Sequence, residues 1–201
     1  MLGLIIKDVH VIMKYRLAYM LGLSVLFMIL LSAFGIQNNF IIIGIIFSSV
    51  EGTIGFDRSS EWEKFAVTLP VSRMQVVLSK YLLSVLLMFV GIALGFMFTI
   101  IVNAAFQLKM IPDGLFRDVV TSIPLLLVIN ALVIFINLKT FRFTTAAVII
   151  GALVFWGMYG VLSGYFDLSY PQAFGALLVV SIILYVISFF LAYLLYRRKD
   201  L

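Results

Sequence analysis

Six long apolar runs, separated by short polar segments, constrain the fold of this chain more than any other feature. About 20 mostly apolar helical residues are needed to cross a hydrocarbon core of about 30 Å. The runs are continuously apolar and lack the alternation of a membrane β-strand, so they favour helices over a barrel. We therefore predict an all-α polytopic membrane protein with six transmembrane helices, at approximately residues 17–36, 40–56, 81–106, 119–138, 143–162 and 174–196.

The composition agrees with lipid as the surrounding solvent. Hydrophobic residues make up 64% of the chain and charged residues 11%, against about 45–50% and about 25% in soluble domains. The apolar run 17–36 is longer than the core of a signal peptide, about 7–15 residues, so we expect it to remain as a helix. No linker or low-complexity tract interrupts residues 1–201, which predicts a single transmembrane domain.

The distribution of Lys and Arg predicts the orientation in the membrane. Twelve of the fourteen lie at the N-terminus, in the second and fourth connections or in the C-terminal tail, and only Lys109 and Arg117 lie on the other side. The positive-inside rule then places both termini in the cytoplasm. The net charge of +5 is explained by this topology, because the basic residues form no stripe interleaved with aromatics, and we expect no nucleic-acid partner.

Residues 1–16 show the pattern of an amphipathic helix. The residues that gather on one side are Leu2, Leu4, Ile5, Ile6, Val9, Ile12 and Met13. We expect Lys7, Asp8, His10 and Lys14 to face elsewhere, and the helix to lie in the membrane interface. The spacing leaves open a second possibility, a frayed cytoplasmic extension of the first span.

The connection between the second and third predicted spans is the most informative polar segment. It includes Asp57, Arg58, Ser59, Ser60, Glu61, Trp62, Glu63, Lys64 and Phe65. Ser59 or Ser60 can cap a short helix whose first turn carries the two glutamates, and Pro70 would end it. Ser72 can cap the next helix. The segment is either a lever between two spans or an ordinary amphipathic loop, and spacing does not separate these possibilities.

Glu51 is a carboxylate at the end of an apolar run. A charge in hydrocarbon is costly unless it is paired, hydrated or neutralised, which makes it a functional candidate. It could pair with Arg73 or Lys80, tie the second span to the polar segment, or simply reach the cytoplasmic interface.

Enzyme and ATPase functions find little support in the sequence. His10 is the single histidine, there is no cysteine, and Asp113, Asp118 and Asp167 are scattered, so we find neither paired metal ligands nor a catalytic serine–histidine pair. There is no G-x-x-x-x-G-K-[ST] loop to hold a triphosphate. A secondary transporter or a structural membrane subunit remains the alternative, although inverted repeats are not visible.

Several motifs nevertheless resemble those of permease subunits of the ABC-2 family. They are Glu51-Gly52-Thr53, the polar stretch 57–64, Thr68-Leu69-Pro70-Val71-Ser72-Arg73, and Lys80-Tyr81. The chain is most similar to the small permeases of bacterial exporters of amphipathic peptides. The six-span plan matches along the whole chain, whereas the last outer connection, 164–173, is shorter than in polysaccharide or sterol members.

The resemblance implies specific roles and partners. Residues 1–16 would form the elbow helix and residues 57–66 the coupling segment that contacts a separate ATP-binding subunit. ATP and Mg would be bound by that subunit, and this chain would need no cofactor or metal. A second permease, identical or homologous, would complete the transporter in the lipids of a bacterial plasma membrane, and its cargo would be hydrophobic or amphipathic, with peptide favoured.

Overall fold

The computed structural model describes residues 2–33, 46, 50–66, 68, 70–105, 112–139, 144–165 and 170–198, and these residues are helical or lie in turns between helices. The elements in chain order are α1 (Leu2–Val11), η1 (Ile12–Arg16), α2 (Leu17–Ala33), α4 (Glu51–Ser59), α5 (Trp62–Ala66), α6 (Arg73–Ala105), α7 (Pro112–Lys139), α8 (Thr144–Tyr165) and α9 (Tyr170–Arg197). The predicted all-α class is confirmed for the described residues.

The number of membrane spans is confirmed only in part. Within the described residues, four helical stretches are long and apolar enough to cross a bilayer, namely Leu2–Phe27, Arg73–Ile101, Thr121–Lys139 and Gln172–Arg197, and a shorter apolar helix covers Ala146–Leu162. These correspond to the first, third, fourth, sixth and fifth predicted spans. The second, 40–56, lies mainly outside the described residues, and its last part forms the beginning of α4.

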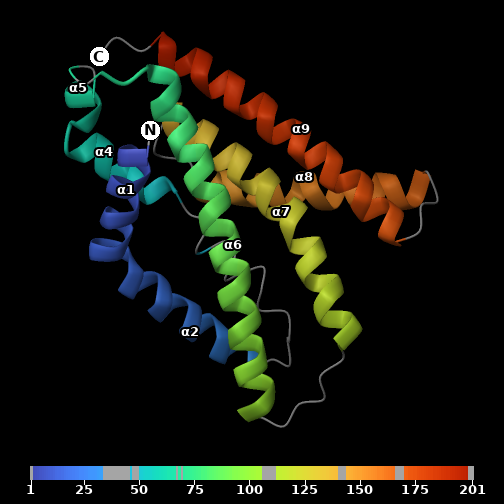
Figure 1. Cartoon of the computed structure of the whole chain (residues 1–201). Coiled ribbons are helices and arrows are strands. Elements are labelled where there is room, and N and C mark those ends of the chain that lie inside the picture. Colours follow the sequence, from blue (N-terminus) through green and yellow to red (C-terminus); the bar gives the residue numbers. More distant parts are fainter. Residues whose placement is uncertain are drawn as a thin grey trace.

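The N-terminal segment is continuous with the first span. The single π-helical turn η1 joins α1 to α2, and the helix axis changes direction there (Figure 1). A π-turn has one more residue in its hydrogen-bonded ring than an α-turn, and such turns often accompany kinks. The predicted position of residues 1–16 in the membrane interface stays a prediction, because their helix runs on into α2.

The burial of Asp8 was not predicted. Asp8 is 1% exposed and lies on the buried side of α1 with Leu4 and Val11. Apolar Leu2 and Ile6 are exposed on the protein surface. Hydrophobicity alone did not indicate this burial, because a buried lysine on another helix balances the Asp8 charge.

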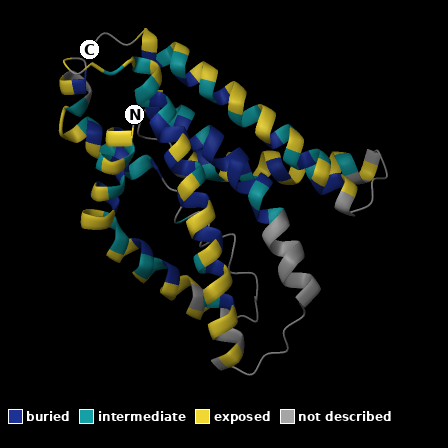
Figure 2. Cartoon of the chain, viewed as in Figure 1, coloured by how far each residue is buried: buried dark blue, intermediate teal, exposed yellow. Residues whose placement is uncertain are grey.

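The centre of the bundle is α7, which packs most extensively against α9 and α8. Within an apolar stretch of 18 residues 72% are buried in α7, against 17% in the corresponding stretch of α9. Figure 2 shows the same contrast between α7 and the exposed faces of α2, α6 and α9. Close contact with α8 depends on Gly151, since a Cβ there would lie 3.1 Å from the Ile129 Cα.

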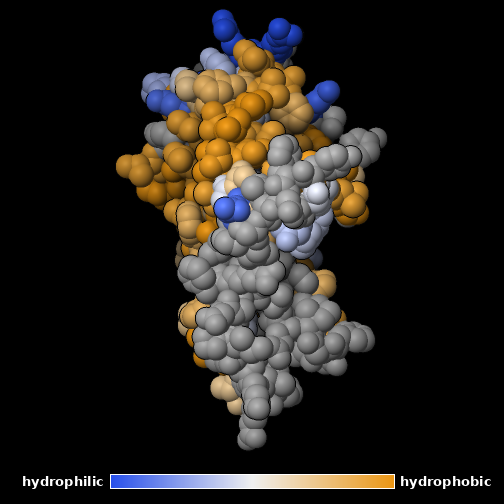
Figure 3. Space-filling view, turned by 90° about the vertical axis from the view of Figure 1, so that its right-hand side faces the viewer, coloured by the Kyte–Doolittle hydropathy of each residue, from blue (hydrophilic) through white to orange (hydrophobic). Residues whose placement is uncertain are grey.

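Polar elements gather at one end of the molecule. The beginning of α6, the end of α9 and the short helices α4 and α5 lie there, near both chain ends (Figure 1). In Figure 3 hydrophilic side chains lie at the upper end, above a broad hydrophobic band. Arg73 Nη1 donates to the Arg197 carbonyl at 2.6 Å, which fastens the beginning of α6 to the end of α9.

The beginning of α6 confirms one predicted cap. The Ser72 hydroxyl accepts a hydrogen bond from the Gln75 backbone N–H at 3.2 Å, and the Gln75 side chain accepts one from the Ser72 N–H at 3.0 Å. This reciprocal pair is a capping box, which satisfies two N–H groups that the helix itself leaves unpaired.

The polar segment before α6 is divided in two, which differs from the single short helix that we predicted. Residues 57–59 belong to α4, and α5 starts at Trp62 after Glu61, whose φ of 53° is left-handed. Ser59 and Ser60 do not begin a helix. Both hydroxyls donate to the Phe56 carbonyl, at 3.0 and 2.7 Å, and so bind the last turn of α4.

Candidate functional site

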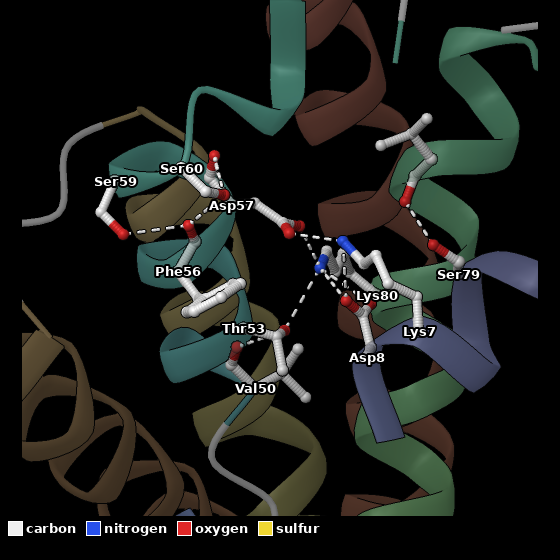
Figure 4. Close-up of polar contacts among 11 residues, drawn as sticks. Lys7, Asp8, Val50, Thr53, Phe56, Asp57, Ser59, Ser60, Ser79 and Lys80 are labelled. Carbon is white, nitrogen blue, oxygen red and sulfur yellow. Dashed lines mark hydrogen bonds and ion pairs between the residues drawn. The ribbon is translucent and has the colours of Figure 1, made fainter. Parts of the chain in front are cut away.

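Lys80 is the central residue of a buried charge cluster, which we define as Lys7, Asp8, Asp57 and Lys80 (Figure 4). The Lys80 ammonium lies 2.9 and 2.8 Å from the two oxygens of Asp8 on α1 and 2.6 Å from Asp57 on α4. Its side chain is 4% exposed. One lysine of α6 therefore holds helices that are distant in sequence.

Lys7 connects the cluster to α5. Its ammonium hydrogen-bonds to Asp57, lies 3.1 Å from Asp8, and is 4.3 Å from the centroid of the Trp62 ring. A cation over an indole face is attracted by the ring quadrupole. Since Lys7 is 24% exposed, it is the most accessible of the four charges and the one that contacts the short helix.

The α4 helix supplies two hydrogen-bond acceptors to Lys80, namely Thr53 and Asp57. Thr53 and Asp57 are four residues apart, so they lie one above the other on the same face. The Thr53 hydroxyl accepts from Lys80 at 3.2 Å and donates to the Val50 carbonyl at 2.9 Å. Both Lys80 and Thr53 are thus hydrogen-bonded within the protein.

The charges of the cluster cancel, with two ammonium groups facing two carboxylates. Moving an ion out of water costs several kcal/mol, and a buried pair is tolerated when geometry and hydrogen bonds are good. Removing one partner leaves an uncompensated charge, which costs about 3–5 kcal/mol. The cluster therefore favours one relative arrangement of α1, α4 and α6.

Further contacts hold α4 against its neighbours. Arg58 Nη2 donates to the Asn137 carbonyl of α7 at 3.3 Å, and the Phe56 ring stacks on Tyr15 of η1 at 5.5 Å between centroids. The Arg16 guanidinium covers Gly52 so closely that a Cβ there would overlap it. The α4 helix is consequently in contact with η1, α6 and α7.

The structure brings only some of the predicted site residues together. Asp57, Trp62 and Lys80 meet at the cluster, whereas Arg58 points to α7 and Phe65 is 54% exposed beside Trp62. The side chains of Glu63 and Lys64 lie outside the described residues.

Lys80 and Arg73, the two predicted partners of Glu51, both have contacts in this region. Lys80 contacts Asp8, Asp57 and Thr53, and Arg73 contacts the end of α9. The pairing and the role of Glu51 stay predictions.

Sequence reasoning missed Lys7, Asp8, Thr53 and Arg16 as members of this region. A signal was present for Asp8, because a lone acid among apolar residues of an amphipathic helix needs a counter-charge when that face is buried. Lys80, just before an apolar run, was the complementary signal. Nothing in the local pattern of Thr53 or Arg16 indicates these contacts, which depend on the packing of α4.

The comparison with known families shows which family the chain belongs to. The profile described as ABC-2 family transporter protein matches residues 3–197, nearly the whole chain. This chain belongs to the ABC-2 family. No curated protein and no solved structure matches it. As an ABC-2 membrane protein it is a transport component rather than a catalyst, and its family in general works with an ABC ATP-binding partner.

Proposed function

We propose that this chain is the permease subunit of an ATP-driven exporter and that α5, together with the end of α4, is the docking element for the ATP-binding subunit. The observation that carries the proposal is the contact of Lys7 with both Trp62 and Asp57. It joins an exposed short helix directly to a buried ionic cluster shared by three longer helices.

The contacts supply a mechanical route into the membrane. A push on α5 reaches Lys7 through Trp62, and the cluster passes it to α1 and α6. Because α6 extends from Arg73 to Ala105, a small rotation at the cluster would move its far end. ATP can drive this change only when its binding discriminates between two arrangements of the permease.

The docking element also sets the orientation. We place α4, α5 and both termini in the cytoplasm of a bacterial cell, since the polar end carries the basic residues favoured on that side and the ATP that the partner needs is cytoplasmic. Two permeases and two ATP-binding subunits would form the working transporter in the plasma membrane. ATP and Mg would be bound by the partner.

The cargo that fits best is hydrophobic or amphipathic, and we favour a peptide. The chain holds 19 Phe and 9 Met, flexible or broad apolar side chains that suit varied cargo. The short predicted outer connections leave little material for a polar external binding site. The surrounding lipids would also contact the apolar side chains of these helices.

Co-purification tests the docking role of α5. The tagged permease is expressed with the ATP-binding subunit encoded beside it, and Glu61-Trp62-Glu63 is replaced by three alanines. We expect loss of the ATP-binding subunit from the purified complex while the permease remains folded. The matched control replaces Met13 by alanine. Met13 is also exposed, but it lies outside α5.

If the triple-alanine variant still binds the ATP-binding subunit and supports coupled ATP hydrolysis as the unaltered chain does, α5 is not the docking element. If no ATP-binding subunit is encoded nearby or binds the unaltered chain, the secondary-transporter or structural-subunit alternative becomes the better account.

A further inference from the structure

A second polar network lies within the membrane-crossing helices, next to the charge cluster but separate from it. It consists of Tyr81 and Ser84 on α6 and Tyr185 and Ser188 on α9, and we refer to these four residues as the hydroxyl clasp. They are buried or half-buried. Lys80 and Tyr81 are consecutive, so the same turn of α6 faces the charge cluster on one side and the clasp on another.

The clasp joins three helices by hydrogen bonds. The Tyr81 hydroxyl pairs with that of Ser188 at 2.8 Å, and Ser188 donates to the Ala131 carbonyl of α7 at 2.6 Å. The Tyr185 hydroxyl donates to the Tyr81 carbonyl at 2.7 Å.

Ser84 completes the network. Its hydroxyl lies within hydrogen-bonding distance of two acceptors, the Tyr185 hydroxyl and the Tyr81 carbonyl, the latter at 2.9 Å, and its single proton can be donated to either. The clasp is thus an interhelical connection, since every pairing between its side chains crosses from α6 to α9.

Ring packing reinforces this connection. The Tyr81 ring meets Tyr185 edge-on at 5.1 Å between centroids and Phe189 edge-on at 5.5 Å. Edge-to-face pairs are the favourable geometry for aromatic rings. Hydroxyls buried in an apolar medium are held to their partners because separation would leave them unsatisfied.

A pocket borders α9 beside the clasp. It has a volume of about 280 Å³ and lies between α7, α8 and α9, with Val154, Leu184 and Leu191 among its lining residues. Ser188 and Ala131 also line it. Without the clasp, α9 would have room to tilt into this space and lose contact with α6.

We propose that the hydroxyl clasp makes α6, α7 and α9 one rigid unit, so that the position set at Lys80 is carried to the C-terminal span. The clasp residues act by positioning helices. The inference rests on contacts inside this chain and does not require the proposed ATP-binding partner.

Spin-label distances test the proposal on the purified chain. The chain has no cysteine, so Met97→Cys on α6 and Val179→Cys on α9, both exposed, can be labelled without a background. Both positions lie outward of the clasp along their helices, where a change of angle gives the largest displacement. We expect one narrow distance distribution in nanodiscs.

Removing the clasp hydroxyls with Tyr185→Phe and Ser188→Ala should abolish the narrow peak and broaden the distribution. Ser79→Ala is the matched control, since Ser79 is buried in α6 and its hydroxyl donates within that helix to Val76 at 2.8 Å. A distribution as narrow in the clasp variant as in the parent, or one already broad in the parent, would overturn the proposal.

Melting temperatures provide a second test if the clasp variants fold too poorly for spin labelling. The shifts in melting temperature of Tyr81→Phe and Ser188→Ala should be non-additive, because these two hydroxyls contact each other, whereas Ser79→Ala with Ser188→Ala should be additive. Additive shifts for the first pair would contradict the clasp.

Discussion

Lys80 is a lysine at the beginning of a membrane-crossing helix whose ammonium contacts carboxylates from α1 and α4. Because the Lys80 side chain is buried, the protein must replace the water that a lysine normally binds. The two aspartates and Thr53 do so. Substituting Lys80 alone should therefore lower the stability more than substituting Lys80 together with one of its carboxylate partners.

Lys80→Met keeps an unbranched side chain, one atom shorter, and removes its charge. Because two buried carboxylates then face Lys7 alone, we expect the free energy of unfolding to fall by about 3–5 kcal/mol. Thermal unfolding in detergent checks this. Lys14→Met, at an exposed position, should change stability by less than about 0.5 kcal/mol.

The double variant Lys80→Met with Asp57→Leu should be more stable than Lys80→Met alone, since an apolar pair replaces an ion pair and Lys7 with Asp8 stays balanced. A double variant that loses as much as the two single variants together would show that these charges do not depend on each other.

Gly52 and Arg16 form a second residue-scale dependence. Gly52→Ala places a methyl group where the Arg16 guanidinium lies, so the arginine must move and we expect a lower melting temperature. In an Arg16→Ala background the same change should raise stability, because alanine favours a helix over glycine by about 1 kcal/mol. The same sign in both backgrounds would contradict the close contact.

At the scale of elements, η1 sets the direction of α1. Its π-turn spans five residues between α1 and α2 and already holds one residue more than an α-helical turn, so a further inserted residue would rotate α1 by about 100°. The faces that α1 presents to α4 and α6 therefore depend on the number of residues in this turn.

Inserting an alanine after Met13 should rotate Asp8 away from Lys80 and reduce the yield of folded protein. Met13 itself is exposed at 63%, so Met13→Ala keeps the register and should be neutral. Size-exclusion profiles and melting curves of the two variants check the prediction; equal behaviour would mean that the register at η1 does not position Asp8.

The capping box of α6 gives a prediction of smaller size. Ser72→Ala removes the acceptor for the Gln75 N–H and should cost about 1 kcal/mol, as other N-cap serines do. Ser72→Asp keeps an acceptor and should retain most of the stability in the same thermal assay.

Elements differed in how far the sequence could predict them. The apolar runs that become α6, α7, α8 and α9 are long, and Ser72 with Gln75 is a local pattern, so both were predictable. The division between α4 and α5 was not, because it depends on the left-handed backbone of Glu61, a conformation that non-glycine residues adopt rarely.

The site was less predictable than the helices. Asp57, Trp62 and Lys80 were singled out by their unusual positions, but their partners Lys7 and Asp8 lie more than 45 residues away in sequence from Asp57. Hydrophobic periodicity did not predict the burial of Asp8, since it cannot anticipate a charge that is balanced after packing.

At the scale of the whole molecule, the polar elements occupy one end and the apolar helices extend from it (Figure 1). The charge cluster and the hydroxyl clasp both lie near this end, on consecutive residues of α6. In the proposed transporter, the ATP-binding subunit would act on the end where the helices are connected by polar contacts, and the motion would grow toward the far side.

The most direct test is the labelling of a cysteine at Phe65, which is 54% exposed on α5, with a membrane-impermeant maleimide. The account predicts labelling only from the cytoplasmic side and protection when the ATP-binding subunit is bound, while a cysteine at exposed Arg198 is labelled from that side in both states. Labelling of Phe65→Cys from the outside, or equal labelling with and without the bound subunit, would contradict it.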